Sequence, residues 1–122
     1  MDAFDRDLAL IGRILSCCSG IERTVERFGQ DYEVFRRDPD YINSVCMNLL
    51  QIGEYAGRLS ERFAEETGAE MAWRQMKSMR NLFAHNYGQM KTDVVWVTVT
   101  EDLPALADFC GRILHDKEKE QE

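Results

Sequence analysis

The sequence has no run of 18 or more apolar residues, so we expect no membrane-spanning helix. Its N-terminus, MDAFDRDLAL, is acidic and polar, which is unlike a secretory signal. The sequence also lacks an H-E-x-x-H motif, a paired E-x-x-H and a glycine-rich phosphate loop, so we expect neither a metal nor a cofactor. No C-x-x-C pair is present, and we interpret the four cysteines as small apolar residues in a reducing cytosol: Cys17, Cys18, Cys46 and Cys110.

Acidic residues are missing from one long window of an otherwise acidic chain. The net charge is −7, which argues against broad, non-specific binding to nucleic acid. The twenty positions from 73 to 92 contain no Asp or Glu, although 22 acids in 122 residues would place three or four there. The window holds five basic residues, which we call the basic island: Arg74, Lys77, Arg80, His85 and Lys91. In its simplest interpretation the island is a solvated helix face that pairs with acidic neighbours.

Apolar residues recur at alternating spacings of four and three, which predicts amphipathic helices. The first helix should run for roughly seven turns and end at the segment GQDYEVFRRDPD. Its predicted apolar stripe is Phe4, Leu8, Ile11, Leu15, Cys18, Val25 and Phe28. A second helix is expected from about Pro39 to Glu66, because Asp38 followed by proline is a good N-cap and first-turn pair. Gly68 is expected to end it as a left-handed cap.

Two further helices complete the prediction. A third is expected from about Glu70 to Gly88. The next segment, DVVWVTVT, has the β-branched composition of a strand, but its continued spacing of three and four favours a helix from about Thr92 to His115, bent near Pro104. The sequence therefore predicts an all-α, antiparallel up-and-down bundle of four to five helices. We expect one domain at residues 1–115 and a charged, frayed tail at 116–122.

The stretch MRNLFAHNYG lies at the centre of the basic island and near the expected end of the third helix. On one straight helix, Arg80 and Tyr87 lie on nearly the same side. His85 is about 140° from Arg80 around the axis and about 7.5 Å along it. One helix thus does not direct Arg80 and His85 at a single small ligand. A symmetric dimer is the simpler way to bring two such stretches together.

The residue types in this stretch suit cleavage of a phosphodiester. A histidine in the last turn of a helix is favoured in its protonated form and can transfer protons near neutral pH. An arginine suits a phosphate, through bidentate contact and through charge stabilisation in the transition state. Together they would cleave RNA without a metal, with the 2′-hydroxyl as nucleophile. The simpler interpretations are a helix cap for His85, an ion pair for Arg80, a backbone hydrogen bond for Asn81 and a packed ring for Tyr87.

Four blocks of the sequence matter together: LLQIGEYAGRLS, AWRQMKSMRN, RNLFAHNY and VVWVTVTEDLPAL. In this order they resemble the HepT-like family of HEPN-domain ribonuclease toxins. RNLFAHNY is similar to that family's R-x-x-x-x-H-x-Y signature. The other blocks are LLQIGEYAGRLS, similar to its helix with an I-G-E-A core, AWRQMKSMRN, similar to its W-R-x-x-x-x-x-R-N run, and VVWVTVTEDLPAL, similar to its next helix. The resemblance covers about Ile42 to Ile113. The chain departs from the family pattern at AEETGAEMAW, where a proline often precedes the tryptophan, and at Tyr55, where alanine is common.

The resemblance implies a HEPN-like homodimer in which two signatures face each other across one composite ribonuclease cleft. It implies that Arg80 binds or polarises the scissile phosphate and that His85 is the acid–base residue. Asn81 and Lys77 would orient the substrate or support the site, and Glu54 would be a further supporting partner. The alternative for Glu54 is a surface or inter-helix ion pair.

The resemblance also implies regulation by a partner protein. In the family, the tyrosine of the signature accepts AMP from an antitoxin with a minimal nucleotidyltransferase fold, and Tyr87 is the matching position. The chain would then be the toxin of a prokaryotic type II toxin–antitoxin system, an endoribonuclease that cleaves RNA in the cytoplasm. A phosphate group beside Arg80 and His85 would occupy the side chains meant for RNA. The alternatives are a non-catalytic HEPN module that binds a nucleotide or a partner, and a helical dimer with no ligand.

Overall fold

The computed structural model describes residues 2–85 and 91–120, with the backbone alone at residues 79, 81–85 and 120. These residues include no strand, so the predicted all-α fold class is confirmed. In this part of the chain the helices outnumber the four to five expected, because two of the expected helices are divided and a short one was missed. The elements are α1 (Ala3–Phe28), α2 (Tyr32–Arg37), α3 (Pro39–Arg58), α4 (Glu61–Thr67), α5 (Trp73–His85), α6 (Thr92–Val97), the π-helix η2 (Thr98–Asp102) and α7 (Leu103–Glu120).

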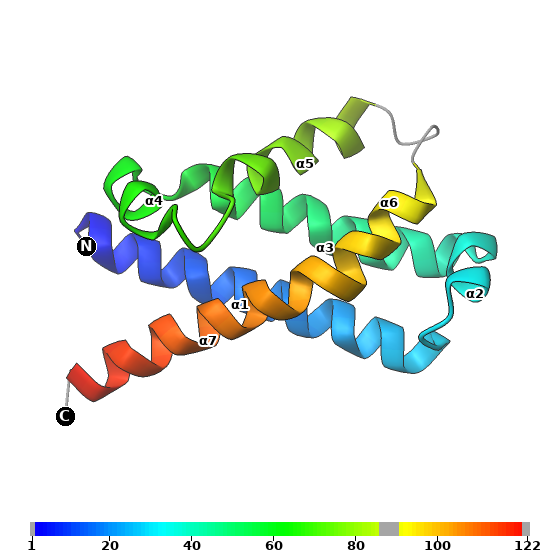
Figure 1. Ribbon diagram of the computed structural model, residues 1–122, viewed down its shortest axis with the longest axis horizontal. Coiled ribbons are helices and arrows are strands. Elements are labelled where there is room, and N and C mark those ends of the chain that lie inside the picture. Colours follow the sequence, from blue (N-terminus) through cyan, green and yellow to red (C-terminus); the bar gives the residue numbers. More distant parts are fainter. Residues whose placement is uncertain (1, 86–90, 121–122) are drawn as a thin grey trace.

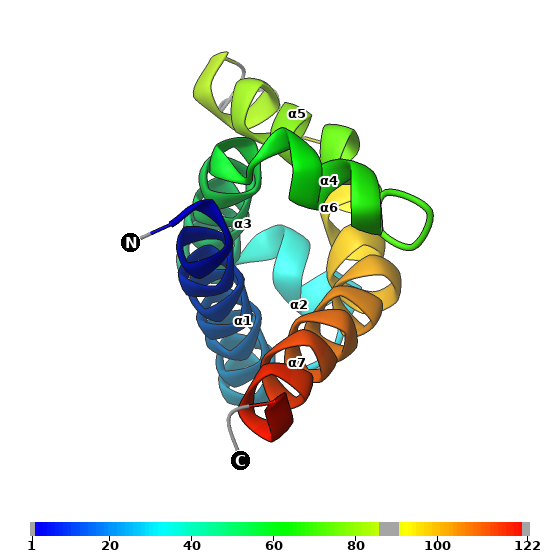
Figure 2. The ribbon, with the colours of Figure 1, turned by 90° about the vertical axis from the view of Figure 1, so that its left-hand side faces the viewer.

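The long helices lie side by side and alternate in direction (Figure 1). Helix α1 packs against both α3 and α7, and α3 also packs against α5. Seen from the end, α1, α3 and the α6–α7 segment surround the core, and α2 lies at its far end (Figure 2). Helix α5 lies at the outer edge of this arrangement, so its position depends mainly on its contact with α3.

Helix α1 has the predicted length, and its predicted apolar stripe packs on the core from Ile11 onward but not in the first turns. Asp2 caps its first turn by accepting a hydrogen bond from the backbone N–H of Asp5 at 2.9 Å. Phe4, the first residue of the predicted stripe, is 48% exposed. The inward position in these first turns belongs to Asp7, which is buried. The predicted stripe is therefore wrong at its N-terminal end, and the buried apolar residues of α1 are Ile11, Ile14, Cys17, Cys18 and Ile21.

The predicted helix from Pro39 to Glu66 is divided in two at Ser60, which corrects the sequence analysis. Asp38 caps α3 as predicted, accepting from the backbone N–H of Asp40 at 2.9 Å. Buried Asp7 accepts hydrogen bonds from the backbone N–H of Ser60 at 2.8 Å and from its hydroxyl at 2.6 Å. The Ser60 hydroxyl oxygen in turn caps α4. The break thus depends on a partner 53 residues away in the chain, which local sequence does not reveal.

The segment GQDYEVFRRDPD contains helix α2, which the sequence analysis missed. Asp31 caps it by accepting from the backbone N–H of Glu33 at 2.9 Å. Phe35 is fully buried, and its ring centroid lies 5.0 Å from that of Tyr41 and 5.1 Å from that of Trp96. These aromatic contacts join α2 to α3 and α6. A helix of six residues is too short for an apolar period to be recognisable.

Gly68 follows α4 without the left-handed conformation that was predicted, since its φ is −65°. A Cβ at this position would lie 2.9 Å from the carbonyl oxygen of Ala64. Glycine is needed here for close approach of the backbone, not for a positive φ. Helix α5 then begins at Trp73, whose indole N–H donates to the hydroxyl of Thr67 at 2.8 Å and closes the connection.

The ambiguous segment DVVWVTVT is helical, as its spacing predicted. Helical structure continues from Thr92 to Glu120, with the π-helix η2 immediately before Leu103 and Pro104. Proline has no N–H to donate to the preceding turn, and a π-helix shifts the hydrogen-bond register. The disturbance expected at Pro104 therefore takes the form of a π-helix. Helix α7 extends into the segment 116–122, where we expected a frayed tail.

All four cysteines are buried, and none of them forms a disulfide bond. Burial raises the pKa of Cys18 and of Cys110 to about 12, and that of Cys46 to about 11. Burial also raises the pKa of Cys17. The thiols are therefore protonated at neutral pH, which agrees with the interpretation of the cysteines as small apolar residues.

Two glycines of α3 form the surface on which α5 packs. A Cβ on Gly53 would lie 2.9 Å from the carbonyl oxygen of Met76 and 3.1 Å from the backbone nitrogen of Arg80. A Cβ on Gly57 would lie at an ordinary 3.5 Å from Cγ of Lys77. The two backbones approach closely because Gly53 has no side chain. We call this approach of α3 and α5 at Gly53 the glycine contact.

Substitution of Gly53 tests the glycine contact. We expect Gly53→Ala to lower the free energy of unfolding by about 1–3 kcal/mol, because the methyl group displaces α5. Gly12 is the matched control, since it is also helical and a Cβ there would meet nothing within 4 Å. Gly12→Ala should be neutral or more stable by up to about 1 kcal/mol. Thermal unfolding checks both variants, and an unchanged melting temperature for Gly53→Ala would contradict the contact.

Candidate functional site

The two residues predicted to be catalytic belong to one helix. Arg80 lies in the second half of α5, and His85 is the last residue of that helix. Positions 80 and 85 are therefore about 7.5 Å apart along the helix axis and about 140° apart around it. The helical geometry on which the sequence argument depended is present, and so is the divergence of the two positions.

Arg80 is paired with Glu54 of α3 across the glycine contact. The distance from Nε of Arg80 to Oε1 of Glu54 is 3.7 Å, and each side chain is 40% exposed. At this distance the pair is an ion pair without a hydrogen bond, so Glu54 takes up none of the guanidinium N–H groups. An exposed pair of this kind is weak and can yield to an anion that binds Arg80. Glu54 thus holds the guanidinium near the surface without saturating it.

Lys77 adds a second cation one turn before Arg80. Its alkyl chain lies against Gly57, with Cγ, Cδ and Cε all at ordinary contact distance from a Cβ built there. The side chain is exposed, and no carboxylate in the described part of the chain forms an ion pair with it. Residues three apart are neighbours on a helix surface, so Lys77 and Arg80 present two positive charges together. Such a surface suits a phosphate group.

The remaining predicted site residues are described incompletely. Asn81 and His85 belong to α5, but only their backbones are described. Tyr87 and Gly88, the expected modification site and the expected end of the helix, lie outside the described residues. The roles predicted for Asn81, His85 and Tyr87 therefore stay predictions.

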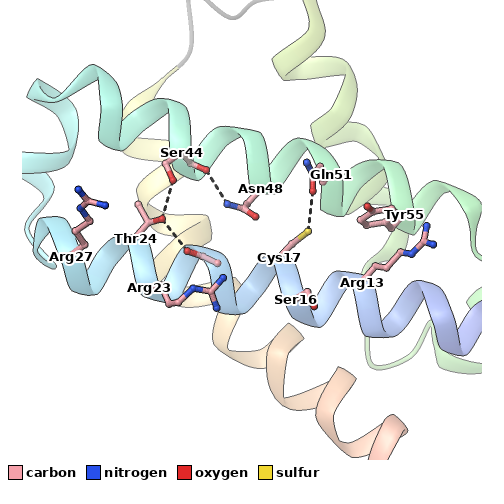
Figure 3. Close-up of a pocket in the computed structure, with 11 residues that line it drawn as sticks. Arg13, Ser16, Cys17, Arg23, Thr24, Arg27, Ser44, Asn48, Gln51 and Tyr55 are labelled. Atoms are coloured by element: carbon pink, nitrogen blue, oxygen red, sulfur yellow. Dashed lines mark hydrogen bonds between the residues drawn. The ribbon is translucent and has the colours of Figure 1, made fainter.

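A second cationic surface, which the sequence analysis did not identify, lies between α1 and α3 (Figure 3). The two helices border a groove of about 590 Å³ whose lining contains no Asp or Glu. We call it the arginine groove, and six of its lining residues matter here: Arg13, Arg23 and Arg27 of α1, and Asn48, Gln51 and Tyr55 of α3. Its signal in the sequence is the recurrence of polar or small residues at positions 13, 16, 20, 23 and 27, one face of a helix.

Hydrogen bonds between the two helices hold the floor of the arginine groove. The hydroxyls of Thr24 and Ser44 lie 2.9 Å apart, and the thiol of Cys17 donates to Oε1 of Gln51 at 3.6 Å (Figure 3). At one end, the guanidinium carbon of Arg13 lies over the ring of Tyr55, 5.8 Å from its centroid. The groove is thus a defined polar surface with charged side chains along it.

Two general findings concern the described residues only. None of the helices in the described ranges is both long and apolar enough to cross a membrane. Within the same ranges, no three His, Cys, Asp or Glu side chains come together as a metal site would require.

The family model and the relatives that match this chain agree on one protein family. The family "Ribonuclease HepT-like" matches residues 14–113 of this chain. A protein of Caldanaerobacter subterraneus subsp. tengcongensis named "Putative RNase TTE0752" is 29% identical over 99 residues, which cover 80% of this chain and 87% of that protein. The "Probable ribonuclease HepT" of Thermococcus cleftensis is 32% identical over 84 residues, which cover 67% of this chain and 76% of that protein. No solved structure matches the chain significantly.

The family match includes the residues that the structure brings together. It extends over α3 and α5, and therefore over Glu54, Lys77 and Arg80 as well as the positions of Asn81 and His85. It also includes most of the arginine groove, since only Arg13 precedes its first residue. On this evidence the chain belongs to the HepT-like family of ribonucleases.

Proposed function

We propose that the chain is a metal-independent endoribonuclease whose cleavage site is built around Arg80 and His85. The observation that carries the proposal is the setting of Arg80. The glycine contact fixes its backbone, Glu54 pairs with its side chain, and the side chain remains 40% exposed. An arginine held in this way, in a member of a ribonuclease family, suits a phosphodiester. Lys77 supplies further positive charge one turn away.

The reaction needs one base, one acid and a cation at the phosphate. The 2′-hydroxyl of RNA loses its proton to the base, its oxygen bonds to phosphorus, and the bond from phosphorus to the 5′-oxygen breaks. The 5′-oxygen takes a proton, which leaves a 2′,3′-cyclic phosphate and a 5′-hydroxyl. His85 exchanges these protons, Arg80 stabilises the charge on the phosphoryl oxygens, and Asn81 orients the substrate or supports His85.

A second copy of the chain completes the proposed site. Positions 80 and 85 diverge by about 140° on α5, so one protomer does not direct both at the same phosphate. In a two-fold symmetric dimer, Arg80 of one protomer and His85 of the other can face one cleft. The homodimer is thus part of the proposal, and it explains why positions 80 and 85 point in different directions on one helix.

The proposed regulation acts on Tyr87. A nucleotidyltransferase antitoxin would transfer AMP from ATP: the phenol oxygen bonds to the α-phosphorus, pyrophosphate leaves, and the phenol proton goes to solvent. The added phosphate is negatively charged and lies seven residues from Arg80 in the sequence. It would occupy the cations that bind RNA, so the chain would act as the toxin of a toxin–antitoxin pair.

The second candidate is a non-catalytic module that binds a nucleotide or a partner protein. Two observations favour it, namely the net charge of −7 and the carboxylate of Glu54, which neutralises part of the charge of Arg80. Tight binding of AMP or of the nucleotidyltransferase, without turnover of RNA, would select this function.

The two histidines of the chain provide a matched test of catalysis. We expect wild-type protein to cleave RNA in the presence of EDTA and His85→Ala to lose about 10²- to 10⁴-fold in rate, the usual effect of removing an acid–base residue. His115→Ala should keep its activity, because His115 is an exposed residue near the C-terminal end of α7 and is not part of the proposed site. Equal rates for wild type and a folded His85→Ala would refute the catalytic role.

Arg80 and Arg74 form a second matched pair on α5. We expect Arg80→Ala to lower the rate of RNA cleavage by about 10²-fold or more, since a group that stabilises the transition-state charge is lost. Arg74→Ala removes the same charge from the same helix and should cost less than about fivefold, the scale of an exposed charge. Similar losses in the two variants, measured with the same RNA, would mean that charge alone matters.

Regulation is tested by the intact mass of the protein after co-expression with a neighbouring nucleotidyltransferase. Wild type should gain one or more AMP units and lose RNA cleavage. Tyr87→Phe should gain none and remain active, because the ring is kept and only the acceptor hydroxyl is removed. Tyr55→Phe is the control and should be modified like wild type. AMP units that persist in Tyr87→Phe would place the modification on another residue.

A further inference from the structure

The arginine groove carries positive charge that the proposed chemistry does not use. Its three arginines are exposed, and none forms an ion pair with a carboxylate in residues 2–85 or 91–120. Several arginines elsewhere on the surface are paired, namely Arg36 and Arg37 with Glu33, Arg62 with Glu66, and Arg112 with Glu70 and Asp108. Arg6, Arg58 and Arg74 are exposed and, like the arginines of the groove, form no ion pair in the described residues, but they do not line the groove. In a chain with net charge −7, unpaired arginines in an acid-free groove leave a local positive field.

The acids of α1 are kept away from this groove. Glu22 and Glu26 immediately precede Arg23 and Arg27 in the sequence, yet they line a different hollow, against Val99 and Leu103. Adjacent residues on a helix point about 100° apart, so Arg23 and Arg27 line the groove while the acid before each of them lies toward the α6–α7 segment. The groove therefore presents cations to a ligand without neighbouring carboxylates to repel it.

The length of the groove favours a polymer over a single nucleotide. Arg13 and Arg27 are 14 residues apart in one straight helix, which places them about 21 Å apart along its axis. Arg23 and Arg27 are one turn, or about 6 Å, apart. A series of cations over such a length suits successive phosphates of one strand.

The other side chains of the groove suit the rest of a nucleotide. The ring of Tyr55 is partly exposed beside Arg13, and aromatic rings next to cations stack bases of single strands. Gln51 accepts from Cys17 through its oxygen, which leaves its amide N–H groups to donate to a sugar or a phosphate. Asn48 lies one turn away on the same face of α3.

The groove and the proposed cleavage site share helix α3. Gln51 and Tyr55 line the groove, and between them in the sequence Glu54 pairs with Arg80. In Figure 3, α5 crosses α3 next to this end of the groove, where Tyr55 and Arg13 lie. A nucleic-acid strand that follows the groove from Arg27 to Arg13 would therefore reach α5.

From these observations we infer that the arginine groove binds the sugar–phosphate backbone of single-stranded RNA and guides it to the site on α5. This inference rests on the proposed ribonuclease function for its purpose, but the binding itself does not require cleavage. The groove would set the affinity for long RNA, whereas Arg80 and His85 would set the rate of the chemical step.

A binding measurement tests the groove directly. The probe is a fluorescent single-stranded RNA of about 20 nucleotides with 2′-O-methyl riboses, which lack the nucleophilic hydroxyl and stay intact. We expect Arg23→Gln/Arg27→Gln to weaken binding of the full-length protein about tenfold at low salt, since an exposed charge contact is worth about three- to fivefold. The slope of log Kd against log salt should fall by about 1.4, because each phosphate contact of a single strand contributes about 0.7. Fluorescence anisotropy measures both quantities.

Arg62→Gln/Arg112→Gln is the matched control, since it removes the same charge from residues outside the groove. This variant should keep the Kd and the salt slope of wild type. Equal weakening in both double variants would show a general charge effect and overturn the inference. Unchanged binding in Arg23→Gln/Arg27→Gln would overturn it as well.

Cleavage of two substrates separates this inference from the proposed function. In Arg23→Gln/Arg27→Gln, KM for long RNA should rise about tenfold, whereas cleavage of a dinucleoside monophosphate, too short to reach the groove, should be unchanged. If no RNA is cleaved by wild type, the proposed function fails and the anisotropy result alone decides on the groove.

Two other results would assign the groove to a different occupant. If the double variant has half the mass of wild type in sedimentation, the groove is a surface between two copies of the chain. Loss of nucleotidyltransferase binding with RNA binding intact would assign it to a protein partner, and either result would overturn the inference.

Discussion

The close approach of α3 and α5 at Gly53 is the constraint on which the candidate site depends. Helix α5 lies at the edge of the molecule, and α3 is its main support. Because Gly53 has no side chain, the backbone of Arg80 comes close enough for its guanidinium to meet Glu54. The same contact lays the alkyl chain of Lys77 over Gly57. A larger residue at position 53 would separate the helices and, with them, every described residue of the site.

Charge in this protein is arranged by face. Several surface arginines are neutralised by carboxylates a turn away or on a neighbouring helix, as Arg62 is by Glu66. Lys77 and the arginines of the groove have no such ion pair in the part of the chain that the structure describes. An acidic chain can therefore bind a polyanion at selected surfaces while its net charge opposes non-specific association. Arg80 lies between these two groups, because it forms an ion pair with Glu54 but its side chain stays partly exposed.

Much of the fold could be predicted where the signal is local. The bounds of α1, the cap at Asp38 and the helical character of DVVWVTVT depend on neighbouring residues, and the structure confirms them. The division at Ser60 could not be predicted, because it depends on buried Asp7, 53 residues away. Helix α2 was missed because its single buried residue, Phe35, shows no period. Gly68 was expected to follow the helix because of a left-handed backbone. Glycine is needed there because a side chain would crowd the Ala64 carbonyl, and not because of φ.

The sequence by itself determined the fold class, the family resemblance and the basic island that contains Arg80, because periodicity, motif order and missing acids can all be counted along the chain. It also determined that positions 80 and 85 diverge, since both lie on one helix of known pitch. Only the tertiary structure decided that Glu54 is the partner of Arg80, because they meet through a glycine whose role depends on the helix packed against it. Only the tertiary structure decided that Arg13, Arg23 and Arg27 share a groove with Tyr55, since a groove has two walls and these come from helices distant in sequence.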